Sequence, residues 1–199
     1  MSSDQETEME TFIDINNVFC SFNVRCKLNL EDIMNRSINV EMKKNRNYVN
    51  MQIREPSAMA KIWPGGKIVC MGTKSEEDAK IASRRIARIL QKLGYPCRFT
   101  NFKVSNVHGS TLLPFTIKIV DFSTAHPEAS YEPELQVIYK IEELKATVTI
   151  HRTGRLVILA PSENSVKQAV EEVYPLVEPF QTIPIKKKKT ITLQIEQKT

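Results

Sequence analysis

Hydrophobic and polar residues alternate along many short segments of this chain, and a period of two residues predicts β-strands. The segments are rich in β-branched side chains, which favour a pleated, half-buried conformation. Gly65-Gly66 and Thr153-Gly154 each separate two such segments and predict tight hairpin turns. The predicted strands are Val49–Ile53, Ala58–Ile62, Lys67–Cys70, Thr116–Ile119, Val137–Ile141, Ala146–Ile150 and Leu156–Leu159.

Two longer segments carry apolar residues at helical spacing. The first is predicted to run from Ser75 to about Leu93, because the capping-box sequence SEED opens it and Gly94 and Pro96 follow it. A second helix is predicted with Ser165 as its N-cap. The apolar stripe of the first helix comprises Ala79, Ala82, Ile86, Ile89, Leu90 and Leu93, and that of the second comprises Val166, Ala169, Val170, Val173 and Val177.

The two halves of the chain repeat one another. Asn17-Val18 recurs 89 positions later as Asn106-Val107, and the segment 62–69 matches 150–157 at an offset of 88. Strand, turn, strand and helix therefore follow in the same order twice. Strands that pair in sequence order, with a helix after each run, predict an α+β fold in which helices gather on one face of an antiparallel sheet. The other face is left for water or a ligand.

Charge distinguishes the two repeats. The whole chain has a net charge of +5, but residues 15–99 hold 16 Lys and Arg against 7 Asp and Glu, whereas residues 100–185 hold 7 against 10. The first helix exposes cations, and the second exposes Glu171 and Glu172, so the two helices cannot serve the same partner. The cations have two possible interpretations, a solvated helix face or a contact with protein or nucleic acid. They are Lys80, Arg84, Arg85, Arg88 and Lys92.

Several functional classes are disfavoured. No apolar run approaches the roughly 20 residues that span a bilayer, and the acidic start is unlike a targeting signal, so we expect a soluble intracellular protein without a membrane partner. The four cysteines and three histidines of the 199 residues lack metal-ligand spacing, which predicts reduced thiols and no metal site. No phosphate-binding loop or nucleophile motif is present. We therefore expect no enzyme activity, no cofactor and no small-molecule substrate.

A series of short motifs gives a specific resemblance. Over about residues 14–183 the chain resembles the TATA-box-binding protein (TBP) family, which implies a saddle of two pseudo-symmetric repeats forming a curved antiparallel sheet with helices on the convex face. The implied divisions are an acidic disordered segment 1–13, repeats 14–99 and 100–185, and a basic tail 186–199. The matching motifs are CKLNLEDI (26–33), IREP (53–56), GKIVCMGTKSEE (66–77), QKLGYP (91–96), NFKVSN (101–106), SYEPEL (130–135) and Tyr174-Pro175.

The chain departs from the family on the DNA-binding side. Family members that kink TATA DNA use four phenylalanines as wedges, two per repeat. The matching positions here are Arg46 (or Asn47 or Tyr48, depending on the gap), Trp63, Gln136 and His151. Small residues of the groove-reading strands are replaced by bulkier ones. The residues expected to face DNA are Asn17, Phe19, Trp63, Met71, Asn106, His108, His151 and Leu159.

The family's positions for protein partners are retained. Tyr131, Glu132, Pro133, Glu134 and Leu135 match the loop that contacts transcription factor IIB, and Asn39, Glu41 and Arg54 match the contact with transcription factor IIA. This combination is most similar to the TBP-like factor branch. The resemblance implies a nuclear RNA polymerase II initiation factor that supports TATA-less promoters, with weak or non-TATA binding of promoter DNA. The alternative is a divergent TATA-box-binding protein that uses Trp63 and His151 as wedges.

Overall fold

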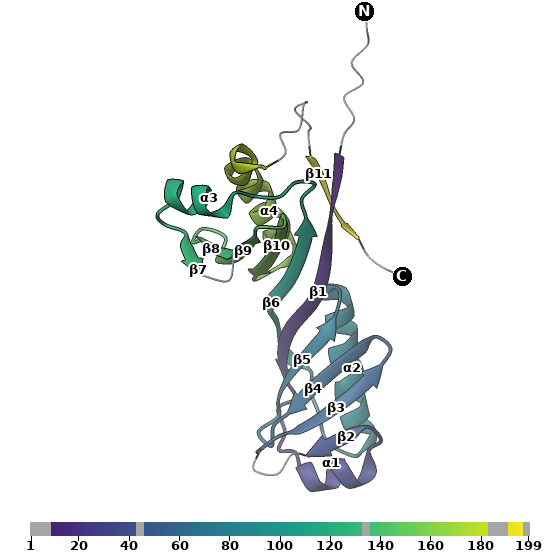
Figure 1. The fold of residues 1–199 in the computed structure, drawn as a ribbon. Helices are drawn as coiled ribbons and strands as arrows, with labels where there is room; N and C mark the ends of the chain where they lie inside the picture. The colour runs from purple at the N-terminus through teal and green to yellow at the C-terminus, as the bar shows by residue number, and fades with distance from the viewer. Residues whose placement is uncertain (1–8, 43–45, 133–135, 183–190, 197–199) are drawn as a thin grey trace, which may run out of the picture. The chain divides into compact units, whose positions relative to one another are not determined.

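The computed structural model describes residues 9–42, 46–132, 136–182 and 191–196, with residues 9–11 and 191–196 described by their backbone. The chain divides into two compact units (Figure 1). Unit 2 is Asn16–Val107, and unit 1 combines Met1–Ile15 with His108–Thr199. Two long strands, β1 (Met9–Asn23) and β6 (Thr100–Leu112), run through both units.

Unit 2 is an antiparallel sheet with helices on one side. Its strands follow the order β2-β3-β4-β5-β1-β6. The helix α2 (Glu76–Lys92) packs on β4 and β5, and Figure 1 shows the opposite side of these strands without a helix. The remaining elements are α1 (Leu30–Arg36), β2 (Val40–Met42), β3 (Val49–Arg54), β4 (Ser57–Ile62) and β5 (Lys67–Thr73).

Unit 1 repeats this plan. Its strand order is β1-β6-β10-β9-β8-β7, and a further strand, β11 (Ile191–Glu196), pairs in parallel with β1. The helix α4 (Glu163–Val177) packs on β9 and β10 and ends in a 3-10 turn, Glu178–Phe180. The remaining elements are α3 (Ile119–Ala125), β7 (Ser130–Glu132), β8 (Gln136–Ile141), β9 (Ala146–His151) and β10 (Arg155–Ala160).

The core of each unit lies between the sheet and its long helix. On β3, Val49, Met51 and Ile53 are buried and alternate with more exposed residues, as the period of two requires. The predicted stripe of α4 is buried along its whole length, and the α2 stripe is buried at Ala79, Ala82, Ile86 and Leu90. Each unit therefore has helices on one sheet face, which confirms the predicted α+β class.

Local sequence determines both ends of α2. Ser75 is the N-cap, and its hydroxyl accepts a hydrogen bond of 3.0 Å from the backbone N–H of Asp78. At the other end Gly94 has a φ of +93°, a conformation that favours glycine, and the helix ends before it. The predicted helix from Ser75 to about Leu93 is confirmed.

Two local predictions are wrong. The N-cap of α4 is Ser162 and not Ser165, because the Ser162 hydroxyl accepts a 3.1 Å hydrogen bond from the backbone N–H of Ser165. The segment Thr116–Ile119 is not a strand. Ile117 forms a single bridge with Gln181, and Ile119 begins α3, where Ile119 and Phe122 are buried three residues apart at helical spacing.

The predicted segment boundaries also differ from the structure. β1 begins at Met9, so part of the acidic segment 1–13 is a strand, and β11 places part of the tail 186–199 beside it. The compact units divide at 15/16 and 107/108, whereas the predicted sequence repeats meet at 99/100. The physical reason is that each unit includes a portion of both long strands. In each portion a side-chain hydrogen bond joins β6 to β1. The Ser105 hydroxyl donates to the Phe19 carbonyl, and the Thr111 hydroxyl donates to the Phe12 carbonyl.

Candidate nucleic-acid interface and docking surfaces

The sheet side opposite the helices, called the open face below, carries a regular grid of side chains in unit 2. Cross-strand pairing aligns Met71 with Met59 and Met59 with Gln52, forming one row. The adjacent row contains Val69, Lys61 and Asn50. These residues alternate with buried ones such as Cys70, Ala60 and Met51, and Met59 is 41% exposed. The open face of unit 2 is therefore mixed, with thioethers and one lysine.

Unit 1 has the same grid at positions 88 residues later. One row contains Leu159, Thr147 and Lys140, and the adjacent row contains Val157, Thr149 and Ile138. The flanking residues Val148, Ile150 and Ile158 are buried, and Leu159 is 36% exposed. The two grids differ in side-chain character, because Thr149 takes the place that Lys61 has in unit 2.

The register of the strands identifies the equivalent wedge positions. Val49 pairs with Ile62 in unit 2, and Val137 pairs with Ile150 in unit 1, again at an offset of 88. Tyr48 and Trp63 flank the first pair, just as Gln136 and His151 flank the second. By this register the counterpart of Gln136 is Tyr48, the last of three alternatives that the sequence left open. Which of Arg46, Asn47 and Tyr48 takes the wedge position remains a prediction, and the internal register favours Tyr48 as the partner of Trp63.

In unit 2 these positions form an aromatic cluster with two cations. The rings of Tyr48 and Trp63 are 5.3 Å apart between centroids, at 49° to each other. Arg46 donates a 2.9 Å hydrogen bond to the Tyr48 hydroxyl, and its Cζ lies 5.7 Å from the Tyr48 ring centroid. The Lys61 Nζ lies 5.5 Å from the same centroid. Aromatic rings beside cations suit stacking on bases next to phosphates.

In unit 1 the equivalent positions are polar. Gln136 lies opposite His151 across β8 and β9, and both side chains are half-buried. The Gln136 side-chain amide donates a hydrogen bond to the Glu132 carboxylate. A polar side chain held in this way is a poor wedge, because inserting it between bases would leave its amide without this partner. The open faces of the two units thus have different chemistry at these positions.

The other residues expected to face DNA occupy the long strands. Asn17 and Phe19 lie on β1, on either side of the buried Val18, and the Asn17 side-chain oxygen accepts a 2.7 Å hydrogen bond from the Gly72 backbone. Asn106 is exposed on β6 within unit 2, and His108 is half-buried on the portion of β6 within unit 1. Asn17 is consequently engaged with β5, which the sequence did not indicate.

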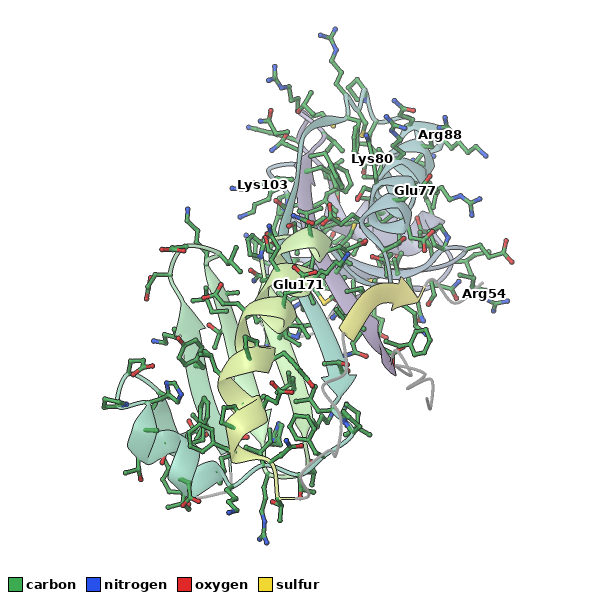
Figure 2. The ribbon with its side chains drawn as sticks, turned by 90° about the horizontal axis from the view of Figure 1, so that it is seen from above. Arg54, Glu77, Lys80, Arg88, Lys103 and Glu171 are labelled. Carbon is green, nitrogen blue, oxygen red and sulfur yellow. The ribbon has the colours of Figure 1, made fainter. Side chains whose placement is uncertain are left out.

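The residues matched to the factor IIA contact lie together on one sheet edge of unit 2. Asn39 precedes the edge strand β2, and its carbonyl accepts a 3.0 Å hydrogen bond from the backbone of Gln52 on β3. Glu41 lies on β2, and Arg54 ends β3 two residues beyond Gln52. All three matched side chains are exposed, and Figure 2 shows Arg54 pointing outward from its strand. Their role in docking remains a prediction.

The residues matched to the factor IIB contact are described in part. Tyr131 is 43% exposed on β7, while Glu132 is half-buried and accepts the Gln136 hydrogen bond. Pro133, Glu134 and Leu135 lie outside the described residues. Glu132 is therefore part of a hydrogen-bonded pair, whereas the sequence suggested a solvent-facing carboxylate.

The cations of α2 do not all have the same environment. Arg85 donates a hydrogen bond to the backbone carbonyl of Glu55, so it fastens α2 to the turn between β3 and β4. The other four cations are exposed, and Figure 2 shows Lys80 and Arg88 on α2, away from the open face. In unit 1, Glu171 projects from α4 in the same figure. The structure thus separates Arg85 from the other four cations.

Sequence reasoning missed part of the open face. Met59 and Lys61 in unit 2 and Lys140 and Thr149 in unit 1 belong to it, but they lie outside the matched motifs. The repeat offset of 88 residues contained the necessary signal, because it relates each member of one grid to a member of the other.

The thiols lie mostly in the core. Cys20, Cys70 and Cys97 are buried, and the Cys26 and Cys97 thiols form a hydrogen bond with 3.5 Å between the sulfurs but no disulfide. Burial raises the pKa of Cys97 to about 12. Within the described residues, no group of three or more His, Cys, Asp or Glu could hold a metal ion. None of the helices in that part of the chain is both long and apolar enough to cross a bilayer.

Known proteins match most of the chain. The family model for transcription factor TFIID, or TATA-binding protein (TBP), matches residues 12–93 and 101–180. TATA box-binding protein-like 1 of Danio rerio is 44% identical over 168 residues, covering 83% of this chain and 90% of that protein. TATA box-binding protein-like 2 of Mus musculus is 39% identical, and the match covers 85% of this chain but half of that protein. The solved structure of Methanococcus jannaschii TBP has a TM-score of 0.75 at 25% identity, covering 84% of this chain and 98% of the other.

Proposed function

The chain belongs to the TBP family of transcription factors, and from this premise we propose that it is a TBP-like initiation factor of RNA polymerase II. In this role it acts in the nucleus, docks transcription factors IIA and IIB, and supports promoters without a TATA box. It contacts promoter DNA weakly and performs no catalysis. The named relatives TATA box-binding protein-like 1 and 2 support placing the chain in this branch.

The polar pair Gln136 and His151 carries the proposal. Unstacking a base step costs a few kcal/mol, and an inserted apolar ring offsets part of that cost. Gln136 cannot do this without losing its hydrogen bond to Glu132. Unit 1 therefore lacks the apolar wedge that a strongly kinked TATA box requires. Phe19, Met71 and Leu159 add bulk to the same open face, which supports the same conclusion.

The alternative, a divergent TATA-box-binding protein, draws support from one observation. Tyr48 and Trp63 preserve an aromatic pair at the wedge positions of unit 2. In this alternative, that pair inserts at one end of a TATA box and His151 replaces the ring at the other. Trp63 and His151 are the wedges in this alternative, and the Tyr48 ring beside Trp63 strengthens its unit 2 half.

An assembly experiment tests the proposal. The chain would be incubated with labelled TATA-less promoter DNA and with factors IIA and IIB, separately and together, and complexes would be resolved on a native gel. We expect a slow-moving complex that requires at least one factor. Arg54→Glu should prevent addition of factor IIA, while Arg98→Glu, a control at an exposed cation outside the matched residues, should not. If the factors add nothing to the complex, the proposed function is wrong.

A further inference from the structure

The four cysteines of the chain all lie in unit 2, where they form two pairs. Cys20 on β1 and Cys70 on β5 are register partners in the antiparallel sheet. The second pair joins Cys26, which follows β1, to Cys97, which follows α2, and 3.5 Å separates its two sulfur atoms. A disulfide has about 2.0 Å between its sulfurs, so the second pair needs only a small movement to form one.

The backbone holds the thiols of the second pair together. On one side of the pair, the Arg98 N–H donates a 2.9 Å hydrogen bond to the Val24 carbonyl. On the other side, the Tyr95 hydroxyl donates a 3.2 Å hydrogen bond to the Asn29 carbonyl. The two segments are therefore joined before and after the thiols. The fold itself, and not only the choice of side-chain rotamers, keeps the two sulfurs close.

Solvent access distinguishes the two pairs. The Cys20 and Cys70 side chains are 0% and 1% exposed, so an oxidant in solution does not reach them in the folded protein. Cys26 is half-buried, and its neighbours Arg25 and Lys27 are exposed. Reactive cysteines typically occupy partly exposed positions beside cations. Cys26 is therefore the thiol that an oxidant meets first.

We propose that Cys26 and Cys97 are a redox modification site, at which a peroxide converts the two thiols into a reversible disulfide. Hydrogen peroxide oxidises the Cys26 thiol to a sulfenic acid, and its O–O bond breaks with release of one water. The Cys97 sulfur then attacks the Cys26 sulfur, so that an S–S bond forms and the S–O bond breaks. The Cys97 proton and the departing hydroxyl group form a second water. The two cysteines lose two electrons, which the peroxide gains, and the inference does not depend on the proposed function.

The environment of Cys97 suits the second step. Burial and the hydrogen bond with the Cys26 sulfur raise the pKa of Cys97 to about 12. At pH 8 only about one Cys97 thiol in ten thousand is ionised, which slows its attack. A group held against its target, however, reacts with an effective molarity of up to about 10⁵–10⁸ M. This proximity offsets the small thiolate fraction for attack on Cys26, but not for reaction with a reagent in solution.

Peptide mapping tests the proposal. The full chain would be treated with hydrogen peroxide at pH 8, its remaining thiols blocked with N-ethylmaleimide in urea, and the protein digested with trypsin without a reductant. Each cysteine then falls in a separate peptide, because a lysine or arginine lies between each cysteine and the next. We expect a disulfide that links peptides 26–27 and 93–98, and dithiothreitol should reverse it. If this link is absent, or if the disulfide joins Cys20 to Cys70 or joins two chains, the proposal is wrong.

Cysteine variants test the order of the two steps. In Cys97→Ala the reaction should stop at the Cys26 sulfenic acid, which dimedone traps as an adduct. In Cys26→Ala, Cys97 should stay a thiol. Cys20→Ala and Cys70→Ala are the matched controls at the other pair, and both should still give the linked peptides. Thermal melting under reducing conditions would confirm that each variant is folded. A folded control variant that gives no linked peptides overturns the proposal.

The melting temperature shows whether the native structure accepts the bond. A disulfide between residues 71 positions apart closes a long loop, and long loops restrict the unfolded chain most. We expect the oxidised chain to melt about 5–10 °C above the reduced chain. Peroxide treatment of Cys97→Ala, which cannot form the bond, should give no such rise. If the oxidised chain melts at the same temperature or lower, the bond forms only by distorting the fold and the proposal is wrong.

Discussion

The ring of Tyr48 packs against the indole of Trp63 at 5.3 Å, at the positions where the second repeat places Gln136 opposite His151. The open face of unit 2 is therefore aromatic at these positions and flanked by Arg46 and Lys61, while the open face of unit 1 is polar there. The two units share the same strand plan but carry different side chains at these positions. This asymmetry predicts that DNA contacts depend on unit 2 more than on unit 1.

Removing the aromatic pair should weaken DNA binding. Tyr48→Ala with Trp63→Ala deletes two rings that can stack on bases, and stacking contributes about 1–3 kcal/mol per base. We expect a loss of affinity of about tenfold or more for a promoter duplex at low salt. Gln136→Ala with His151→Ala, the matched control in unit 1, should change affinity less than about threefold. A larger loss from the unit 1 pair, measured by fluorescence anisotropy, would contradict the assignment.

Charge reversal should disrupt the proposed factor IIB contact. Glu132→Arg with Glu134→Arg places two cations in the loop that is matched to the factor IIB contact, where the partner surface is expected to be basic. Like charges across an interface cost several kcal/mol. Pull-down of factor IIB should fall to background. Glu142→Arg with Glu143→Arg reverses two exposed acids between β8 and β9 and serves as the control. Unchanged pull-down by the first variant would mean that the family contact is not conserved here.

Two adjacent glycines should differ in how much stability the protein loses when each is replaced by alanine. Gly66 has a φ of +82°, and a Cβ built there would lie 2.6 Å from the Cys26 carbonyl oxygen, whereas a Cβ at Gly65 meets nothing within 4 Å. Gly66→Ala should therefore cost at least about 1 kcal/mol of unfolding free energy. Gly65→Ala should be close to neutral. Chemical denaturation of both variants checks this, and equal midpoints would show that the turn adapts.

Cys97 should resist alkylation in the folded protein. Burial raises its pKa from 9.0 to about 12, so its thiolate fraction at pH 8 is about a thousandfold below that of an ordinary thiol. Iodoacetamide labelling followed by mass spectrometry should modify Cys97 on unfolding and hardly at all before it. The raised pKa also means that this site stabilises the fold below about pH 9 and loses that effect as the pH approaches 12. Rapid labelling in the native state would contradict the burial.

Sequence reasoning succeeded where the signal was local or repeated. The ends of α2 followed from Ser75 and Gly94, and both grids follow from one offset of 88 residues. It failed where the local sequence was compatible with two different structures. Ser162 and Ser165 are three residues apart and both can cap a helix, and in the structure the Ser162 hydroxyl accepts the capping hydrogen bond from the Ser165 N–H. The β-rich segment Thr116–Ile119 became a single bridge and a helix start, because packing of Ile119 and Phe122 overrode local propensity.

In the candidate site too, some features could be predicted from the sequence and others could not. The motifs predicted which positions would differ from the family, but the gap between Arg46 and Tyr48 could not be placed from one sequence. The pairing of Val49 with Ile62 makes Tyr48 the internal counterpart of Gln136, which favours Tyr48 among the three alternatives. The hydrogen bond from Gln136 to Glu132 was also beyond the sequence, because it depends on how β7 and β8 bring two side chains together.

The central claim is that this TBP-family chain does not recognise the TATA box strongly. The most direct measurement is the affinity and bend of a doubly labelled TATA duplex, by fluorescence energy transfer at 150 mM salt, against a scrambled duplex of equal composition. We predict weak binding that differs less than about tenfold between the two duplexes, a small bend, and a steep loss of affinity with added salt. A nanomolar, TATA-selective complex with a strongly bent duplex would contradict the account.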